Sequence, residues 1–271
     1  MSFDMIEFEC RHDTAWITLN RPQALNAIKP PETLRELHGA FEMVRNDPTL
    51  RSVVLTGAGD KAFCIGTDIS FLSAAYETRD FSRFRDYLEQ INETLFALEE
   101  LPLPTVAMVQ GNARAGGFEL ILACDFLIMA DDARIGDVHT PFGHIPGAGS
   151  TQRLARRIGI QRTLHLILSG QWLSGPEAVE AGLALKSVPR QELREATERL
   201  VEDFSNKSRE SLMYVKRAVL RGWDLPLRDG VNLEVQSYIE YLATSNEPAE
   251  RFRANQERRR ARKGLSTQVD G

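Results

Sequence analysis

The sequence has few cysteines, and the three that it has form no pattern. Cys10, Cys64 and Cys124 lie far apart in a chain of 271 residues. Their spacing is not that of a metal site or of a disulfide framework. Isolated cysteines of this kind are typical of reduced thiols in a cytoplasmic protein. We therefore expect a cytoplasmic location and no bound metal.

Long hydrophobic runs and an excess of positive charge are also missing. No apolar stretch reaches the roughly 20 residues that cross a bilayer, and the first residues lack the basic and apolar regions of a signal peptide. The 33 lysines and arginines are outnumbered by 38 aspartates and glutamates, which gives a formal net charge of −5 and a pI near 5.7. No global basic field attracts nucleic acid. The sequence therefore predicts neither a nucleic acid nor a membrane as a partner.

The patterns that are present indicate an α/β protein with a helical C-terminal region. Strand-like apolar runs occupy residues 6–10, 15–19, 52–57, 105–109, 126–129 and 133–135. Helical periodicity separates them at residues 32–45 and 84–98, and this alternation is typical of α/β folds. Later segments with helical patterns are residues 161–168, 175–182, 191–204, 208–220, 227–243 and 248–261. We expect a core over residues 1–200 and a helical region over residues 201–271.

The segment with the clearest chemical potential is residues 104–125. A strand pattern at residues 105–109 is followed by small residues and by a short buried helix that begins at Gly116. Glycine at a helix start lets a ligand approach unpaired backbone N–H groups, which can stabilise an oxyanion. Glu119 lies about one turn further along this apolar helix. Alternatively, the glycines form a packing turn and backbone N–H groups hold the carboxylate.

Five segments in order resemble the crotonase family, the enoyl-CoA hydratase/isomerase superfamily. They are residues 19–27 (LNRPQALNA), 62–69 (AFCIGTDI), 111–125, 145–154 (IPGAGSTQRL) and 168–183. Each segment alone is a weak signal, but together they cover about residues 5–190. The resemblance implies a crotonase-like spiral of β-β-α turns. It also implies that the helical C-terminal region builds homotrimers, often paired as a dimer of trimers.

The resemblance implies a chemistry that agrees with the local pattern. Members of this family bind acyl-CoA thioesters and hold the thioester oxygen with two backbone N–H groups. By motif position these belong to Thr67 and Gly116, and they would stabilise a thioester enolate. Glu119 matches the first of two acid–base glutamates in the family's hydratases. Coenzyme A enters as part of the substrate, so no separate cofactor is implied.

Further contacts with the acyl-CoA follow from the same motif positions. Substrate-binding residues would be Ile65, with its backbone near the adenine, Asp68, Arg114 and Gly147; Lys61 and Leu25 would contact the CoA moiety. Lys61 is otherwise a solvated turn lysine. Arg114 replaces a residue that is usually small or apolar, and it either meets a substrate carboxylate or points outward. The basic run at residues 258–263 either binds phosphate, in its own or a neighbouring subunit, or ends a solvated helix favoured by the helix dipole.

One departure from the family pattern affects the predicted reaction. The second glutamate of the hydratases falls eight residues before the glycine of Ile-Pro-Gly, and here that position is His139. A histidine can position water or move a proton, and Asp137 could orient it. The other interpretation is a loop histidine that is hydrogen-bonded for structure.

The most direct expectation is hydration of a 2-enoyl-CoA, or the reverse dehydration. Glu119 would be the principal acid and base, with His139 in place of the second glutamate. The first alternative is hydrolysis of a C–C bond or a thioester, although Ala148 stands where a supporting aspartate is expected. Double-bond isomerisation comes next. The alternative that is not an enzyme is a non-catalytic relative that binds CoA or RNA. The retained Glu119 argues against loss of catalysis, and the acidic pI argues against RNA binding.

Overall fold

A computed structural model describes the backbone of residues 3–79 and 81–266, and the side chains of this range up to residue 257. Contacts within the chain divide it into two units, Met1–Asn206 and Lys207–Gly271. The boundary expected at residue 200 falls inside a helix, α8 (Leu193–Ser205), and this helix belongs to the first unit.

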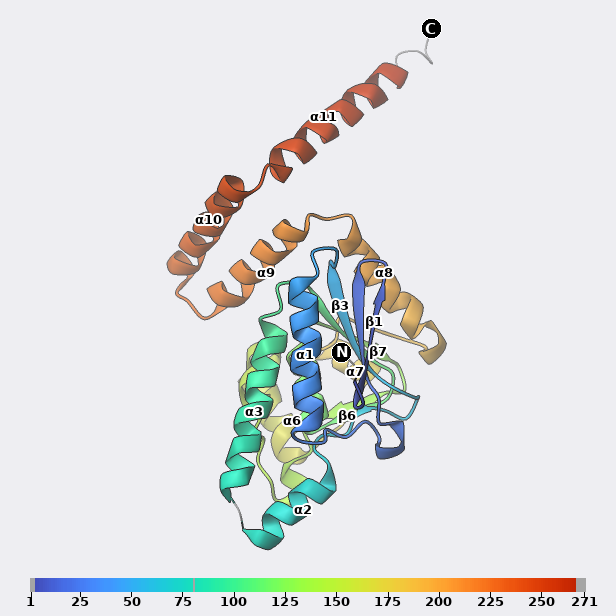
Figure 1. The fold of residues 1–271 in the computed structure, drawn as a ribbon, viewed down its shortest axis with the longest axis vertical. Helices are drawn as coiled ribbons and strands as arrows, with labels where there is room; N and C mark the ends of the chain where they lie inside the picture. The colour runs from blue at the N-terminus through green and yellow to red at the C-terminus, as the bar shows by residue number, and fades with distance from the viewer. Residues whose placement is uncertain (1–2, 80, 267–271) are drawn as a thin grey trace. The chain divides into compact units, whose positions relative to one another are not determined.

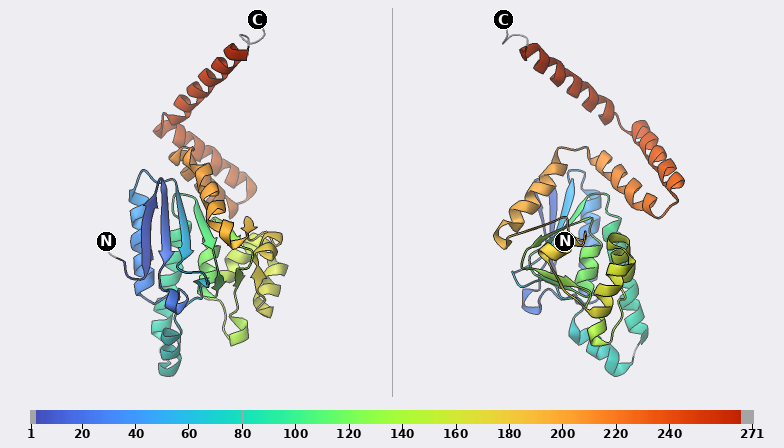
Figure 2. Two further views of the ribbon diagram at one scale, coloured as in Figure 1. Left: turned by 90° about the vertical axis from the view of Figure 1, so that its right-hand side faces the viewer. Right: turned by 180° about the vertical axis from the view of Figure 1, so that it is seen from behind.

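The main sheet of the first unit has six strands among the described residues. In chain order they are β1 (Ile6–Arg11), β2 (Thr14–Leu19), β3 (Ser52–Gly57), β5 (Thr105–Val109), β7 (Phe126–Ala130) and β10 (Lys186–Val188). The strands lie in the same order across the sheet (Figures 1 and 2). β1 and β2 form an antiparallel hairpin, and every other neighbouring pair is parallel. The α/β expectation is therefore confirmed.

A second, smaller sheet determines where the site lies. It contains β4 (Ala62–Cys64), β6 (Asn112–Arg114), β8 (Arg134–Gly136) and β9 (Leu173–Ser174). The first three are parallel to one another, and β9 is antiparallel to β8. Each of β4, β6 and β8 follows a main-sheet strand after a short connection and precedes helical structure. The chain therefore repeats a β-β-α turn, which is the spiral that the resemblance implied.

Helices cover the main sheet where the sequence shows helical periodicity. α1 (Glu32–Asn46) buries an apolar face that includes Leu37 and Phe41, and α3 (Phe81–Glu99) buries Ile91 and Leu95. The two helices pack side by side, as Figure 1 shows. β3 and β5 are buried along their whole length, as expected for parallel strands covered on both faces. The core thus holds the strands whose ends carry the site.

Other helices of the first unit were predicted in part. They are α2 (Ile69–Thr78), α4 (Gly116–Leu122), α5 (Ser150–Ile158), α6 (Ile160–Ser169) and α7 (Gly175–Glu180). α4, α6 and α7 were expected near their observed positions, whereas α2 and α5 were not predicted. α5 buries only two residues, Ser150 and Leu154. Its sequence therefore carries too few apolar positions to show a helical stripe.

The second unit contains three helices in its described part. They are α9 (Arg209–Trp223), α10 (Leu227–Thr244) and α11 (Glu247–Ser266). α9 packs against α10, and a buried hydrogen bond of 3.0 Å joins the Ser208 and Tyr241 hydroxyls. Many apolar side chains of this pair are exposed: Val215, Val219, Leu220, Trp223, Val231, Val235, Ile239 and Leu242. In neither unit do the described residues contain a helix long and apolar enough to cross a membrane.

Candidate active site

Three parallel strands of the smaller sheet end at the same edge. β4, β6 and β8 are neighbours in this sheet, and the chain continues from them at residues 65, 115 and 137. Because the carboxyl ends of neighbouring parallel strands lie together, these three turns meet at one place. The sheet thereby brings together the predicted site residues Thr67, Gly116, Glu119 and His139.

The turns after β4 and β6 touch through their backbones. A Cβ built on Gly66 would lie 3.0 Å from the Gly116 nitrogen, and one built on Gly116 would lie 3.7 Å from the Thr67 nitrogen. Gly116 opens α4, so its N–H has no carbonyl partner within the helix. In the described part of the chain, neither this N–H nor that of Thr67 has a hydrogen-bond acceptor. Two unpaired donors this close can hold one anionic oxygen.

The start of α4 is held by a strained residue and by close packing. Ala115 has φ 48° and ψ −123°, a conformation that costs a residue with a Cβ about 1–3 kcal/mol. Its N–H donates to the carbonyl oxygens of Gly136 at 3.3 Å and Asp137 at 3.2 Å. A Cβ on Gly117 would lie 2.0 Å from the Cys64 carbonyl oxygen. Only glycine therefore lets α4 approach β4 at this distance.

Glu119 is buried in the first turn of α4, with 2% of its surface exposed. Its Oε1 accepts hydrogen bonds from the N–H of Ala148 at 2.8 Å and of Ser150 at 3.4 Å. No described residue donates to its Oε2. Burial raises the pKa of Glu119 to about 7, although the charge of His139 and the two N–H bonds lower it. A carboxyl that titrates near neutral pH can both accept and release a proton.

His139 follows β8 and is oriented by Asp137. The His139 Nδ1 lies 2.8 Å from Asp137 Oδ1, and the His139 backbone N–H donates to the same oxygen at 3.3 Å. Burial lowers the pKa of His139, but the hydrogen bond and charge of Asp137, with the charge of Glu119, raise it above the ordinary value of 6.5. Because a carboxylate oxygen only accepts, Nδ1 carries the proton in this pair. The other ring nitrogen, Nε2, remains available for a hydrogen bond or a proton transfer with a ligand.

A tyrosine of α3 completes the surroundings of the carboxyl group. The hydroxyl groups of Tyr87 and Thr67 share a hydrogen bond. Burial raises the pKa of Tyr87, and the charge of Glu119 raises it further, so the phenol stays protonated. The Tyr87 side chain therefore links the turn that carries the Thr67 N–H to the region around Glu119.

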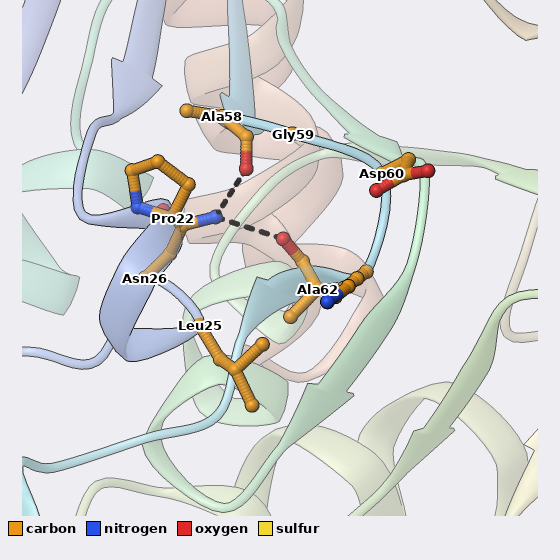
Figure 3. A pocket seen from close by; sticks show the side chains of 8 residues that line it. Pro22, Leu25, Asn26, Ala58, Gly59, Asp60 and Ala62 are labelled. Carbon is orange, nitrogen blue, oxygen red and sulfur yellow. Dashed lines mark hydrogen bonds between the residues drawn. The ribbon is translucent and has the colours of Figure 1, made fainter.

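A separate pocket of about 210 Å³ lies beside the turn before β4. It is lined by Pro22, Leu25, Asn26, Ala58, Gly59, Asp60, Lys61 and Ala62 (Figure 3). Asn26 Nδ2 donates to the carbonyl oxygens of Ala58 at 2.9 Å and Ala62 at 2.8 Å, as the dashed lines in Figure 3 show. These bonds hold the loop of residues 21–27 against the β3–β4 connection. The two predicted CoA contacts, Leu25 and Lys61, thus lie in one pocket.

Comparison with known proteins decides the family. The model of the family described as enoyl-CoA hydratase/isomerase matches residues 9–262. The chain belongs to the enoyl-CoA hydratase/isomerase family. It is thus an enzyme of the enoyl-CoA hydratase/isomerase type.

Individual relatives match over almost the whole chain. The protein YngF of Bacillus subtilis is 35% identical over 95% of this chain and 97% of its own length. The crotonyl-CoA hydratase of Syntrophomonas wolfei is 31% identical over 91% of this chain and 93% of its own. The crystal structure of the enoyl-CoA hydratase from Bacillus anthracis superposes with a TM-score of 0.89 at 33% identity, covering 94% of this chain and 97% of that one.

In this hydratase/isomerase family member, other predicted contact residues lie around the same turns. Arg114 is half-buried, and its Nε donates to the Ile65 carbonyl oxygen at 3.3 Å. Gly147 packs against α3, where a Cβ would lie 2.7 Å from Leu88 Cδ2. The basic run at residues 258–263 lies outside the side chains that the structure describes.

Asp68 has structural partners within the protein. Its carboxylate accepts a hydrogen bond from the Ser70 N–H at 3.1 Å, which caps α2, and forms an ion pair of 2.9 Å with Arg21. The hydrogen bond from the Ser70 hydroxyl is the largest contribution that lowers the pKa of Asp68. Burial raises this pKa, and Arg21 lowers it further. These contacts fix the turn that contains Thr67. The structure therefore gives Asp68 a role in shaping the turn.

Sequence reasoning missed three side chains that support the site. Tyr87, Asn92 and Arg153 contact the turn or the loop that hold the donors and Glu119. Tyr87 lies four residues before Ile91 on the buried stripe of α3. A polar group on an apolar stripe was the available signal for it. Arg153 belongs to a recognised motif segment, but no local pattern shows which group it contacts.

Proposed function

We propose that this enzyme adds water to a 2-enoyl-CoA, or removes water from the 3-hydroxyacyl-CoA. The observation that supports it is the position of a buried carboxyl group with a pKa near 7, Glu119, in the helix that begins with a predicted oxyanion donor. Hydration needs an acceptor for a proton of water and a donor for the α-carbon. One carboxyl group that titrates near neutral pH can act as both in sequence.

Binding begins at the pocket formed by Leu25 and Lys61. The Lys61 ammonium is exposed and suits a phosphate of coenzyme A. The thioester then extends past Ile65 to the N–H groups of Thr67 and Gly116. Coenzyme A is part of the substrate in this proposal, and the reaction involves no further cofactor.

The chemical step follows from the charges around the thioester. The N–H groups of Thr67 and Gly116 draw electron density toward the carbonyl oxygen, which makes the β-carbon electrophilic. The carboxylate of Glu119 removes a proton from water, and the resulting hydroxyl bonds to the β-carbon. The enolate formed then takes the same proton from Glu119 at the α-carbon. His139 holds the water through Nε2.

The experiment follows enoyl absorbance and free thiol separately in a panel of acyl-CoAs. Loss of enoyl absorbance without free thiol is the expected result. Glu119→Gln should lower the rate by about 10²–10⁴-fold, and His139→Ala by less. His139→Glu restores the second carboxyl group of the family pattern and should raise hydration of a simple 2-enoyl-CoA. Turnover of every enoyl-CoA at the uncatalysed rate would refute the proposal.

The second candidate is hydrolysis, and the Asp137–His139 pair is the observation that favours it. A histidine oriented by a carboxylate can activate water for attack on a carbonyl carbon. In that reaction the oxyanion donors would hold a tetrahedral intermediate. Release of free CoA by the wild type, with no gain from His139→Glu, would establish this candidate in place of hydration.

We further propose that the protein assembles as a homotrimer or a dimer of trimers through its second unit. The exposed apolar residues of α9 and α10 form a large surface of the kind that monomers rarely show. Sedimentation of the untagged protein at micromolar concentration should give a species of three or six chains. A single species of 30.5 kDa would refute the assembly.

A further inference from the structure

Helix α3 is linked to the loop that holds Glu119 by three polar side chains. Asn92 Nδ2 donates to the Gly147 carbonyl oxygen at 2.9 Å. Arg153 Nη1 donates to the Ala148 carbonyl oxygen at 2.9 Å. Glu99, the last residue of α3, accepts two hydrogen bonds from the Arg153 guanidinium. We call Asn92, Glu99 and Arg153 the α3 clamp.

The contact between Glu99 and Arg153 has the geometry of a strong ion pair. Arg153 Nε and Nη2 lie 2.7 Å and 2.8 Å from the two carboxylate oxygens. The arginine side chain is 10% exposed and the glutamate 31%. A bidentate arginine pair fixes the direction of the guanidinium as well as its distance. The third guanidinium nitrogen, Nη1, is therefore held toward Ala148.

The loop backbone at Gly149 packs closely against the Arg153 guanidinium. The φ of Gly149 is +91°, in the left-handed region, and a Cβ there would lie 2.0 Å from Arg153 Nη1. The loop therefore approaches the guanidinium without any side chain between them. Leu88 of α3 contacts the same loop at Gly147. The clamp is thus the polar part of a close fit between α3, the loop and α5.

The peptide group between Gly147 and Ala148 connects the clamp to Glu119. Its carbonyl oxygen accepts from Asn92, and its N–H donates to Glu119 Oε1 at 2.8 Å. A hydrogen bond to the carbonyl polarises the peptide and strengthens the bond that its N–H donates. Arg153 holds the next carbonyl, so the peptide cannot rotate freely. The orientation of this N–H therefore depends on both sides of the clamp.

We propose that Asn92 and Arg153, the latter held by Glu99, are positioning residues that aim the Ala148 N–H at the Glu119 carboxylate. This inference rests on the proposed acid–base role of Glu119. None of the three clamp residues touches the substrate in the proposed mechanism. Their effect passes through one backbone N–H, which stabilises the ionised form of the carboxyl group.

The direction of the effect on the pKa of Glu119 follows from its neighbours. His139 and Asp137 interact with it from the loop after β8, and Tyr87 from α3. The Ala148 and Ser150 N–H groups are its hydrogen-bond donors, and both lower its pKa. Weakening the Ala148 bond must therefore raise the pKa of Glu119 above its value in the wild type. It should leave the other groups in place.

The test measures the protonation of Glu119 directly, in the full-length protein without substrate. Infrared titration follows the carboxyl band that disappears in Glu119→Gln. Arg153→Met and Asn92→Ala should each raise the midpoint of this band by roughly half to one pH unit, and Glu99→Gln by less. The acidic limb of the pH–rate profile should shift in the same direction. Arg45→Met is the matched control, because Arg45 also joins a glutamate to a backbone carbonyl, at Glu42 and Ala97.

Each outcome of this test decides the proposal. Folded Arg153→Met and Asn92→Ala proteins with the wild-type midpoint would overturn it, even if they unfold more easily, because a purely structural role changes stability alone. If Arg153→Met does not fold, Asn92→Ala and Glu99→Gln carry the same test. The double variant should shift less than the sum of the two, since both act on one N–H. If the protein hydrates no enoyl-CoA, the proposed function fails, while the infrared midpoints still decide the role of the clamp.

Discussion

The hydroxyl groups of Tyr87 and Thr67 share a hydrogen bond that ties α3 to the turn after β4. This turn presents the Thr67 backbone N–H, one of the two proposed donors to the thioester oxygen. The phenol itself need not react, because its contact fixes the side chain of the residue whose backbone binds the substrate.

Tyr87→Phe should therefore lower kcat by about tenfold or less, with a smaller change in KM. The variant removes one part-buried hydrogen bond, so we expect the free energy of unfolding to fall by about 0.5–1.5 kcal/mol. Steady-state kinetics and urea unfolding measure the two effects. Tyr76→Phe is the control, because the exposed Tyr76 hydroxyl contacts only His144 among the described residues. Equal losses of kcat in both variants would contradict the role of the Thr67 contact.

The raised pKa of Glu119 makes the free energy of unfolding depend on pH. The unfolded chain releases this proton near pH 4.5, and the folded protein holds it to about pH 7. The stabilisation by the bound proton is complete below about pH 4.5 and is lost as the pH rises through 7. Between pH 5 and 8 the wild type should lose about 2.5 kcal/mol through this group.

Glu119→Gln does not titrate, so it should gain about 2.5 kcal/mol relative to the wild type over the same interval. Denaturant unfolding of both proteins at pH 5, 6, 7 and 8 measures this difference. Glu100→Gln, at an exposed position, is the control and should show no such trend. A constant difference between Glu119→Gln and the wild type would show that Glu119 titrates normally in the folded protein.

Asp137→Asn should lower the pKa of His139. The burial that lowers this pKa would remain, whereas the charge of the aspartate that raises it would be lost and its hydrogen bond to Nδ1 replaced by a weaker one to the amide oxygen. NMR titration of the imidazole, assigned with His139→Gln, measures the shift. We expect kcat to fall by about 10- to 100-fold, because a neutral amide holds the ring less firmly and stabilises its protonated form less. Asp132→Asn, in an exposed ion pair with Arg190, should change neither quantity.

Lys61→Met should raise the KM for an acyl-CoA by about fivefold, since one exposed charge contact with a phosphate contributes up to about 1 kcal/mol. It should leave the KM for the matching acyl-pantetheine unchanged, because that substrate carries no phosphate. Lys29→Met is the control, as Lys29 pairs with Glu32 on α1. A rise in KM for both substrates would place Lys61 away from the phosphates.

Much of the main sheet could be predicted from the sequence, but only one strand of the smaller sheet could, namely β8, which overlaps the run expected at residues 133–135. β3 and β5 are apolar runs of five or six residues that end at glycine or just before it, and such runs indicate buried strands. β4 and β6 have three residues each, which is too short for an alternating pattern. Their pairing follows from the three-dimensional path of the spiral. Composition and periodicity therefore predicted most strands of the main sheet and the helices that cover it. The family resemblance predicted the β-β-α turns of the spiral.

The candidate site divides in a similar way. Glu119 could be found because a carboxyl group in an apolar helix is costly to bury and so indicates a function. His139 could be found because it occupies the motif position of the family's second glutamate. Asn92 and Arg153 reach carbonyl groups that lie 55 and 5 residues away in the chain. Helical periodicity indicates which face a residue occupies but not the group that it meets across the molecule. Sequence reasoning therefore located the proposed reacting groups better than the residues that hold them.

The contact between Gly117 and the Cys64 carbonyl oxygen has a consequence for how substrate range can change. No side chain separates the two turns at this point, so the spacing of the proposed oxyanion donors is set by backbone against backbone. Substitutions elsewhere in the site can therefore accumulate without altering that spacing. A library that varies Gly117 should therefore recover almost only glycine among folded, active proteins.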